Sequence, residues 1–176
     1  MSIISIGYSR RSIEEFTKAL VDHGVRYLID VRTKPFSKYS PDFNGENLQV
    51  TLRNVGVKYV FMGDTVGGLP RDPECYTNGK VDYRKTADSV VFKQGLERLI
   101  KANNLSVNVS IMCAEMKPEQ CHRSKLIGEE LLKNGIYINH LDEENIIRTQ
   151  KEIIDRITNG QCSMFDDEFT SVKKYR

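Results

Sequence analysis

A short segment in the second half of the chain carries several side chains that can do chemistry together. An apolar, strand-like run ends there and a helical pattern begins, and the segment contains Cys113, Glu115, Cys121, His122 and Arg123. Thiols, imidazoles and carboxylates act as nucleophiles or exchange protons, and arginine binds anions. We therefore predict catalytic roles for the two cysteines, the histidine and the glutamate.

Cys121 is the favoured nucleophile. Pro118 suits the first turn of a helix that is expected to run to Asn134, so Cys121 would lie in that first turn. Orphan backbone amides and the helix dipole stabilise a thiolate there, and Arg123 adds positive charge. The alternative is that Cys113 and Cys121 are buried and inert, which is common for free cysteines.

Composition indicates one globular domain at residues 1–160 with a loose tail at 161–176. The chain has 176 residues, is 39% hydrophobic and carries a net charge of +2, so it has no global attraction to nucleic acid or to a membrane. No apolar run approaches the roughly twenty residues of a spanning helix. Four irregularly spaced cysteines and the lack of a signal-type N-terminus predict a cytoplasmic protein.

Helical patterns repeatedly end in glycine just before short β-branched runs, as at Gly24-Val25, Gly56-Val57 and Gly135-Ile136. The pattern predicts a single three-layer α/β domain, with a mostly parallel sheet of about five strands and helices on both faces. The expected strands are residues 2–9, 25–32, 57–61, 105–113 and 136–141. The first expected helix begins at Ser12. Four further helices are expected at residues 45–55, 82–102, 118–134 and 142–158.

Polar residues that follow the strands should meet at one edge of such a sheet, where α/β folds bind ligands. We expect an anion-binding site formed by Ser9, Arg10, Arg32, Ser37 and Arg123. Asp30 would orient Arg32 or act as a base, although a strand-end carboxylate is as often structural. Further candidates from the loops and the last strand are Asn44, Gly67, Gly68 and His140.

The combined motifs resemble an uncharacterised family catalogued as domain of unknown function 488, over Ser2 to Leu141. The resemblance is carried by Ser5-Ile-Gly7-Tyr-Ser9, Asp30-Val-Arg32-x-x-Pro35-x-Ser37, Phe43-Asn44, Gly67-Gly68, Cys113-Ala-Glu115-x-x-Pro118-x-x-Cys121-His122-Arg123 and His140. Tyr8 stands where that family commonly has histidine. The resemblance implies this set of residues and no particular activity.

The order of three segments in the chain also resembles, more distantly, that of a group of domains with a known type of cysteine chemistry. Segments ending at Arg32, at Cys113 and at His140 follow the order of rhodanese-like domains, in which a strand-end cysteine carries a persulfide or, in phosphatase relatives, a phosphoryl group. Cys113 matches the nucleophile of those domains, but its loop contains Glu115 and Glu119, and nearby carboxylates raise the pKa of a thiol. The layout is therefore expected to be rhodanese-like or Rossmann-like, with Cys121 or the cysteine pair reacting.

These observations favour an enzyme that transfers a sulfur or phosphoryl group of an anionic small molecule, with no cofactor required. One alternative is a nucleic-acid-associated protein that contacts the backbone through Arg10, Arg11, Arg32 and Lys34. A second alternative is a zinc or iron site at Cys113, Cys121, His122 and His140. The spacing argues against the metal, because adjacent Cys121 and His122 would diverge by about a hundred degrees on a helix.

Overall fold

The computed structural model describes residues 3–105, 107–159 and 169–175. Its centre is a six-stranded sheet with the order β3-β2-β6-β1-β7-β8, in which the first five strands are parallel and β8 is antiparallel to β7. The strands are β1 Ile3–Gly7, β2 Val25–Asp30, β3 Lys58–Phe61, β6 Asn108–Cys113, β7 Ile138–Leu141 and β8 Ile147–Thr149. The predicted mostly parallel α/β sheet is confirmed.

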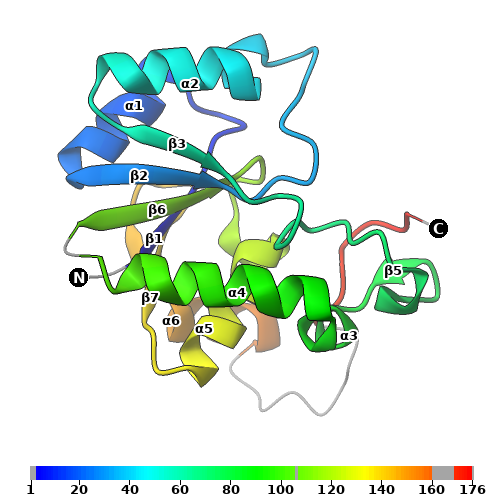
Figure 1. Cartoon of the computed structure of the whole chain (residues 1–176). Helices are drawn as coiled ribbons and strands as arrows, with labels where there is room; N and C mark the ends of the chain where they lie inside the picture. Colours follow the sequence, from blue (N-terminus) through cyan, green and yellow to red (C-terminus); the bar gives the residue numbers. More distant parts are fainter. Residues whose placement is uncertain (1–2, 106, 160–168, 176) are drawn as a thin grey trace.

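Helices cover both faces of the sheet. Helices α1 (Ile13–Asp22) and α2 (Gly45–Asn54) lie on one face, while α4 (Val90–Asn103), α5 (Glu129–Lys133) and α6 (Gln150–Thr158) lie on the other (Figure 1). Each face has its own apolar core, one around Phe16, Leu28 and Leu52 and one around Phe92, Leu99 and Ile111. The predicted three-layer arrangement is therefore present.

The sequence signals for helix ends explain several element boundaries. Ser12 and Glu15 form the predicted capping box at the start of α1. The long helix expected at residues 82–102 is instead two helices, α3 (Tyr83–Asp88) and α4. Ser89 separates them, because its backbone is extended and its side chain accepts a hydrogen bond from the Phe92 amide as the cap of α4.

Two predicted helices differ from the structure. Residues 118–134 form a short 3-10 turn (Pro118–Gln120), a π-helix (Arg123–Gly128) and α5 rather than one helix. Cys121 lies between the first two with an extended backbone (φ −117°, ψ 148°), so the prediction that it sits in a helical first turn is wrong. Residues 142–149 form a turn and β8, so the last helix begins at Gln150, where Thr149 supplies a capping box.

The C-terminal segment also differs from expectation where it is described. Of the predicted loose tail at 161–176, residues 161–168 and 176 lie outside the described residues. The amide of Ser171 donates to the Val81 carbonyl and the amide of Tyr175 to the Gly79 carbonyl. These bonds fix the segment against the hairpin of β4 (Tyr76–Thr77) and β5 (Lys80–Val81), as Figure 1 shows. Among the described residues, no helix is long and apolar enough to cross a membrane.

Candidate active site

A cavity of about 840 Å³ opens at the carboxyl ends of the central strands. Parallel pairing places the ends of β2, β6 and β1 side by side, with Gly7 next to Cys113 and Asp30 next to Met112. The predicted site residues that line this cavity are Ser9, Arg10, Arg32, Ser37, Gly68, Cys113, Glu115, Cys121 and His122. The sheet edge therefore brings together most of the residues predicted from sequence.

Four side chains meet at the base of the cavity, and we call Cys113, Glu115, Cys121 and His122 the thiol cluster. The Glu115 carboxylate lies 2.9 Å from Cys113 Sγ and 3.4 Å from Cys121 Sγ. His122 Nδ1 lies 3.6 Å from Cys121 Sγ and 4.0 Å from Cys113 Sγ. The two thiols and the imidazole therefore face one point, because the extended backbone at Cys121 lets neighbouring side chains converge.

Arg123 is fully buried and contacts the thiol cluster through Cys121. Its Nε donates to Cys121 Sγ at 3.3 Å, Nη1 donates to Ser5 Oγ and Nη2 donates to the Glu115 carbonyl. No described carboxylate forms an ion pair with this guanidinium, which stays charged at any accessible pH. The sulfur of Cys121 is therefore the group best placed to balance the buried positive charge.

The two thiols differ sharply in acidity. The hydrogen bond with Cys121, together with burial, raises the pKa of Cys113 well above its ordinary value. Burial alone would raise the pKa of Cys121, but the hydrogen bond from Cys113 and the positive charges of Arg123 and His122 hold this pKa well below its ordinary value. The pair therefore shares one proton, which stays on Cys113.

The other two members of the thiol cluster respond to the charge on Cys121. Burial would lower the pKa of His122, but the charge and hydrogen bond of Cys121 raise it overall. The negative charge of Cys121, and then burial, raise the pKa of Glu115. A carboxylate beside a thiolate is electrostatically unfavourable, so the cluster favours an additional proton or cation.

A buried chain of hydrogen bonds continues from Arg123 into the core. His140 Nδ1 lies 2.6 Å from Ser5 Oγ, and His140 Nε2 lies 2.6 Å from Gln150 Oε1. The Gln150 amide nitrogen donates to the Ser124 carbonyl, so its oxygen accepts from His140 Nε2, and Nδ1 accepts the Ser5 hydroxyl. Burial, followed by the charge of Arg123, lowers the pKa of His140 to about 4. His140 is therefore a neutral positioning residue, and both of its nitrogens are engaged away from the thiol cluster.

Asp30 and Arg32 form a second buried pair at the end of β2. Arg32 Nη2 donates to Asp30 Oδ2 at 2.6 Å, and Arg32 Nε donates to Asp30 Oδ1 at 2.9 Å. The Tyr59 hydroxyl also donates to Asp30, while Arg32 reaches the Tyr8 hydroxyl and the Phe43 carbonyl. Burial would lower the pKa of Arg32, but the hydrogen bonds of Asp30 raise it. Asp30 is completely buried, and its hydrogen bonds hold the Arg32 side chain in the lining of the cavity.

The remaining loop candidates have mainly structural roles in the described structure. Asn44 Oδ1 accepts from the Ser37 amide at 2.6 Å and so closes the loop that carries Ser37. A Cβ atom at Gly67 would lie 2.2 Å from the Gly63 carbonyl oxygen, so this position requires glycine. A Cβ atom at Gly68 would lie 2.7 Å from His122 Nδ1. Glycine at position 68 therefore leaves the imidazole nitrogen accessible.

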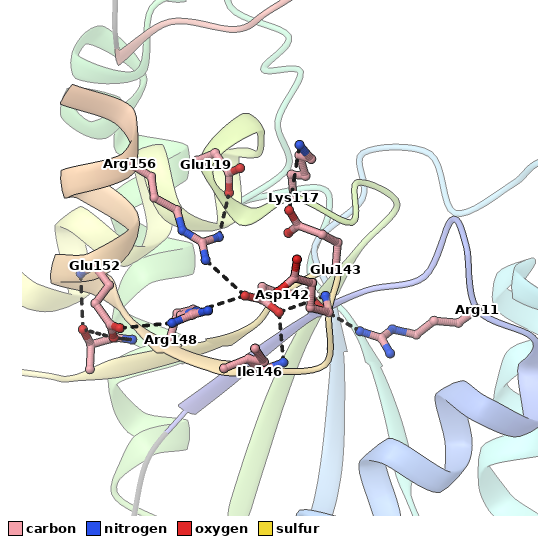
Figure 2. Close-up of polar contacts among 11 residues, drawn as sticks. Arg11, Lys117, Glu119, Asp142, Glu143, Ile146, Arg148, Glu152 and Arg156 are labelled. Carbon is pink, nitrogen blue, oxygen red and sulfur yellow. Dashed lines mark hydrogen bonds and ion pairs between the residues drawn. The ribbon is translucent and has the colours of Figure 1, made fainter. Parts of the chain in front are cut away.

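A second polar cluster surrounds Asp142 at the end of β7 (Figure 2). Asp142 Oδ2 accepts from Arg148 at 3.0 Å and from Arg156 at 3.2 Å, and Oδ1 accepts from the amides of Glu144 and Ile146. Burial would raise the pKa of Asp142, but these hydrogen bonds lower it. Both oxygens of the Asp142 carboxylate thus accept hydrogen bonds from the surrounding residues. The cluster therefore fixes the turn between β7 and β8.

Several residues of the site have no clear signal in the sequence. Ser5 is a hydroxyl residue inside an apolar strand, and that position could have indicated a buried polar role. Gln150 falls in the middle of the helix expected at residues 142–158, where nothing in the sequence marks it as part of a site. Ser171, Val172, Lys173 and Tyr175 also line the cavity, although no local pattern links this segment to the hairpin that holds it.

The fold and site define an α/β domain with a paired-cysteine cluster at the carboxyl edge of a mostly parallel sheet. A family model described as domain of unknown function DUF488 matches residues 12–129. The chain belongs to this family, as the motifs predicted. No curated protein and no solved structure matches the chain.

Proposed function

We propose that the protein is an enzyme that binds an anionic small molecule in the cavity and uses Cys121 as a nucleophile. The observation that carries the proposal is the fully buried Arg123, whose Nε reaches Cys121 Sγ and which has no carboxylate partner among the described residues. A buried guanidinium requires a nearby anion, and a thiolate supplies it. Cys121 lines the base of the cavity, so a substrate bound there would lie beside this residue.

The lining of the cavity supports an anionic substrate. Arg10, Arg32, Lys34, Lys117 and Lys173 line it, against the carboxylates of Glu115 and Glu143. Lys117 pairs with Glu143 at 3.8 Å and Arg32 pairs with Asp30 at 2.6 Å, which leaves Arg10, Lys34 and Lys173 in excess over Glu115. Such an arrangement attracts sulfate-like or phosphate-like groups and orients them over the thiol cluster.

Sulfur transfer is favoured over phosphoryl transfer. The Glu115 carboxylate, 3.4 Å from Cys121 Sγ, would repel a cysteinyl phosphate with two negative charges more strongly than a cysteine persulfide with one. In the proposed step the Cys121 thiolate attacks the outer sulfur of a donor such as thiosulfate. The new S–S bond forms as the donor's S–S bond breaks, and sulfite leaves with the electron pair.

The test is to incubate the protein with thiosulfate and to measure its mass and the sulfite released. We expect the mass of one added sulfur atom in the wild type, located on the peptide that contains Cys121. Cys121→Ser should lose the addition, whereas Cys75→Ser, a change at a buried cysteine outside the cavity, should retain it. No addition in the wild type, or addition that persists in Cys121→Ser, would contradict the sulfur-transfer proposal. A cysteinyl phosphate formed from an aryl phosphate would instead favour phosphoryl transfer.

The free state of Cys75, Cys113 and Cys121 suits a reducing compartment, and we propose the cytoplasm.

A second candidate function is binding of single-stranded nucleic acid at the rim of the cavity. Phe36 and Tyr39 are 73% and 84% exposed on the loop that also carries Lys34, and such aromatic side chains stack on bases. Salt-dependent oligonucleotide binding that survives Cys121→Ser would support this candidate, and its absence would exclude it.

A further inference from the structure

Three atoms of the thiol cluster have the arrangement of a metal site. Cys113 Sγ, Cys121 Sγ and His122 Nδ1 all lie within 4.8 Å of one another, and all three residues are buried. In a tetrahedral zinc site, Zn–S bonds of about 2.3 Å and Zn–N bonds of about 2.0 Å place sulfur and nitrogen about 3.5 Å apart. The observed sulfur-to-nitrogen distances are 3.6 and 4.0 Å. Only small side-chain shifts would complete three bonds to one ion.

The surroundings already hold these ligands as a metal site requires. His122 Nε2 lies 3.1 Å from the Val31 carbonyl oxygen, so Nε2 carries the proton and Nδ1 faces the sulfurs. Both the backbone amide and Nε of Arg123 donate to Cys121 Sγ, which stabilises a metal-bound thiolate. Gly68 leaves Nδ1 uncovered, because any side chain there would contact that atom.

The charges of the thiol cluster also favour a cation. The Glu115 carboxylate lies within 3.4 Å of both sulfurs, although no described lysine or arginine forms an ion pair with it. A divalent ion beside the sulfurs would neutralise the two thiolates and attract this carboxylate. Glu115 lines the cavity, so the fourth position of a tetrahedral ion would face the cavity and this side chain.

We propose that the chain binds one Zn²⁺ through Cys113, Cys121 and His122, with the fourth position open to the cavity. His140, which the sequence placed in the ligand set, is excluded because Ser5 and Gln150 occupy its two nitrogens. A metal-bound sulfur is a poor nucleophile, so zinc reversibly blocks Cys121. This consequence rests on the proposed function, whereas the binding itself does not.

The binding test uses the full chain, stripped of metal with a chelator and titrated with Zn²⁺ and with Co²⁺ as a spectroscopic probe. We expect one ion per chain and, with cobalt, the intense thiolate charge-transfer and visible bands of a tetrahedral site. Cys121→Ser and His122→Ala should each weaken binding by about 100-fold or more, and Glu115→Gln by about tenfold, as expected for a neighbouring group. Cys75→Ser is the matched control and should bind as the wild type does.

Zinc binding no tighter in the wild type than in a Cys113→Ser/Cys121→Ser variant, or a cobalt spectrum without thiolate bands, would overturn the metal site. Sulfur addition to Cys121 in the metal-free protein would then still stand. Conversely, tight zinc binding with no sulfur addition in the metal-free protein would sustain the metal site and reject the proposed function. Sulfur addition undiminished by saturating zinc would overturn the proposed block.

Discussion

The thiol cluster and the Asp142 cluster both follow a strand at the same edge of the sheet, yet their charges are balanced differently. Asp142 is 1% exposed and has two arginines and two amides around its carboxylate, so each acceptor oxygen has its donors. In the thiol cluster, a carboxylate and two sulfurs share one imidazole and one guanidinium. A carboxylate whose donors all come from the surrounding fold thus stabilises a turn, while a carboxylate held against a thiolate beside a cavity is poised to bind a proton or a cation.

Removal of one carboxylate charge from each cluster should give the largest contrast. Asp142→Asn leaves Arg148 and Arg156 with only their longer ion pairs to Glu152 and Glu119, and it should lower the free energy of unfolding by about 2 to 3 kcal/mol. Glu115→Gln removes a carboxylate that the charge of Cys121 disfavours, so stability should be unchanged or higher. Urea denaturation of both variants measures the difference. Equal losses of stability would mean that Glu115 is as structural as Asp142.

As the pH falls, the stability contributed by His140 should be lost before the stability contributed by the Asp142 cluster. The pKa of His140 is about 4 in the fold and about 6.5 when unfolded, so protonation favours the unfolded chain. Its contribution is complete above pH 6.5 and is lost as the pH falls to 4, by about 3 kcal/mol at most. The pKa of Asp142 is lowered, so its contribution is lost only below its unfolded value of 3.8.

Denaturation midpoints measured from pH 7 to pH 3 test this order. His140→Asn should flatten the loss between pH 6.5 and 4, while the loss below pH 4 remains. The same change in stability between pH 6.5 and 4 in the wild type and in His140→Asn would show that His140 is not held neutral in the folded state.

Exposed cations at the rim should have the smallest effect. Arg10 and Lys34 line the cavity but are exposed, so solvent screens their charges. Arg10→Ala and Lys34→Ala should each weaken thiosulfate or sulfate binding by about 1 kcal/mol or less, and more so at low salt. Calorimetric titration at two salt concentrations provides the measurement, with Lys18→Ala, outside the cavity, as the control.

The layers, the parallel sheet and nine of the residues that line the cavity were predictable from sequence because these depend on local signals. Glycine after a helix, β-branched runs and strand-end polar residues are all visible without a structure. The backbone at Cys121 was not predictable, because a 3-10 turn and a π-helix replace the expected regular helix. The prediction that adjacent Cys121 and His122 diverge failed for the same reason. Contacts between Ser5, His140 and Gln150, and between residues 171–175 and β5, join segments that are distant along the chain.

The rate at which Cys121 is alkylated shows whether this residue is an activated thiolate. Cys75 and Cys121 are both 2% exposed, but burial raises the pKa of Cys75, whereas the hydrogen bond from Cys113 and the positive charges of Arg123 and His122 lower the pKa of Cys121. We expect iodoacetamide to modify Cys121 in metal-free protein at pH 7 at least about tenfold faster than Cys75, as followed by peptide mass spectrometry. Modification of Cys121 at the rate of Cys75 or slower would contradict the account.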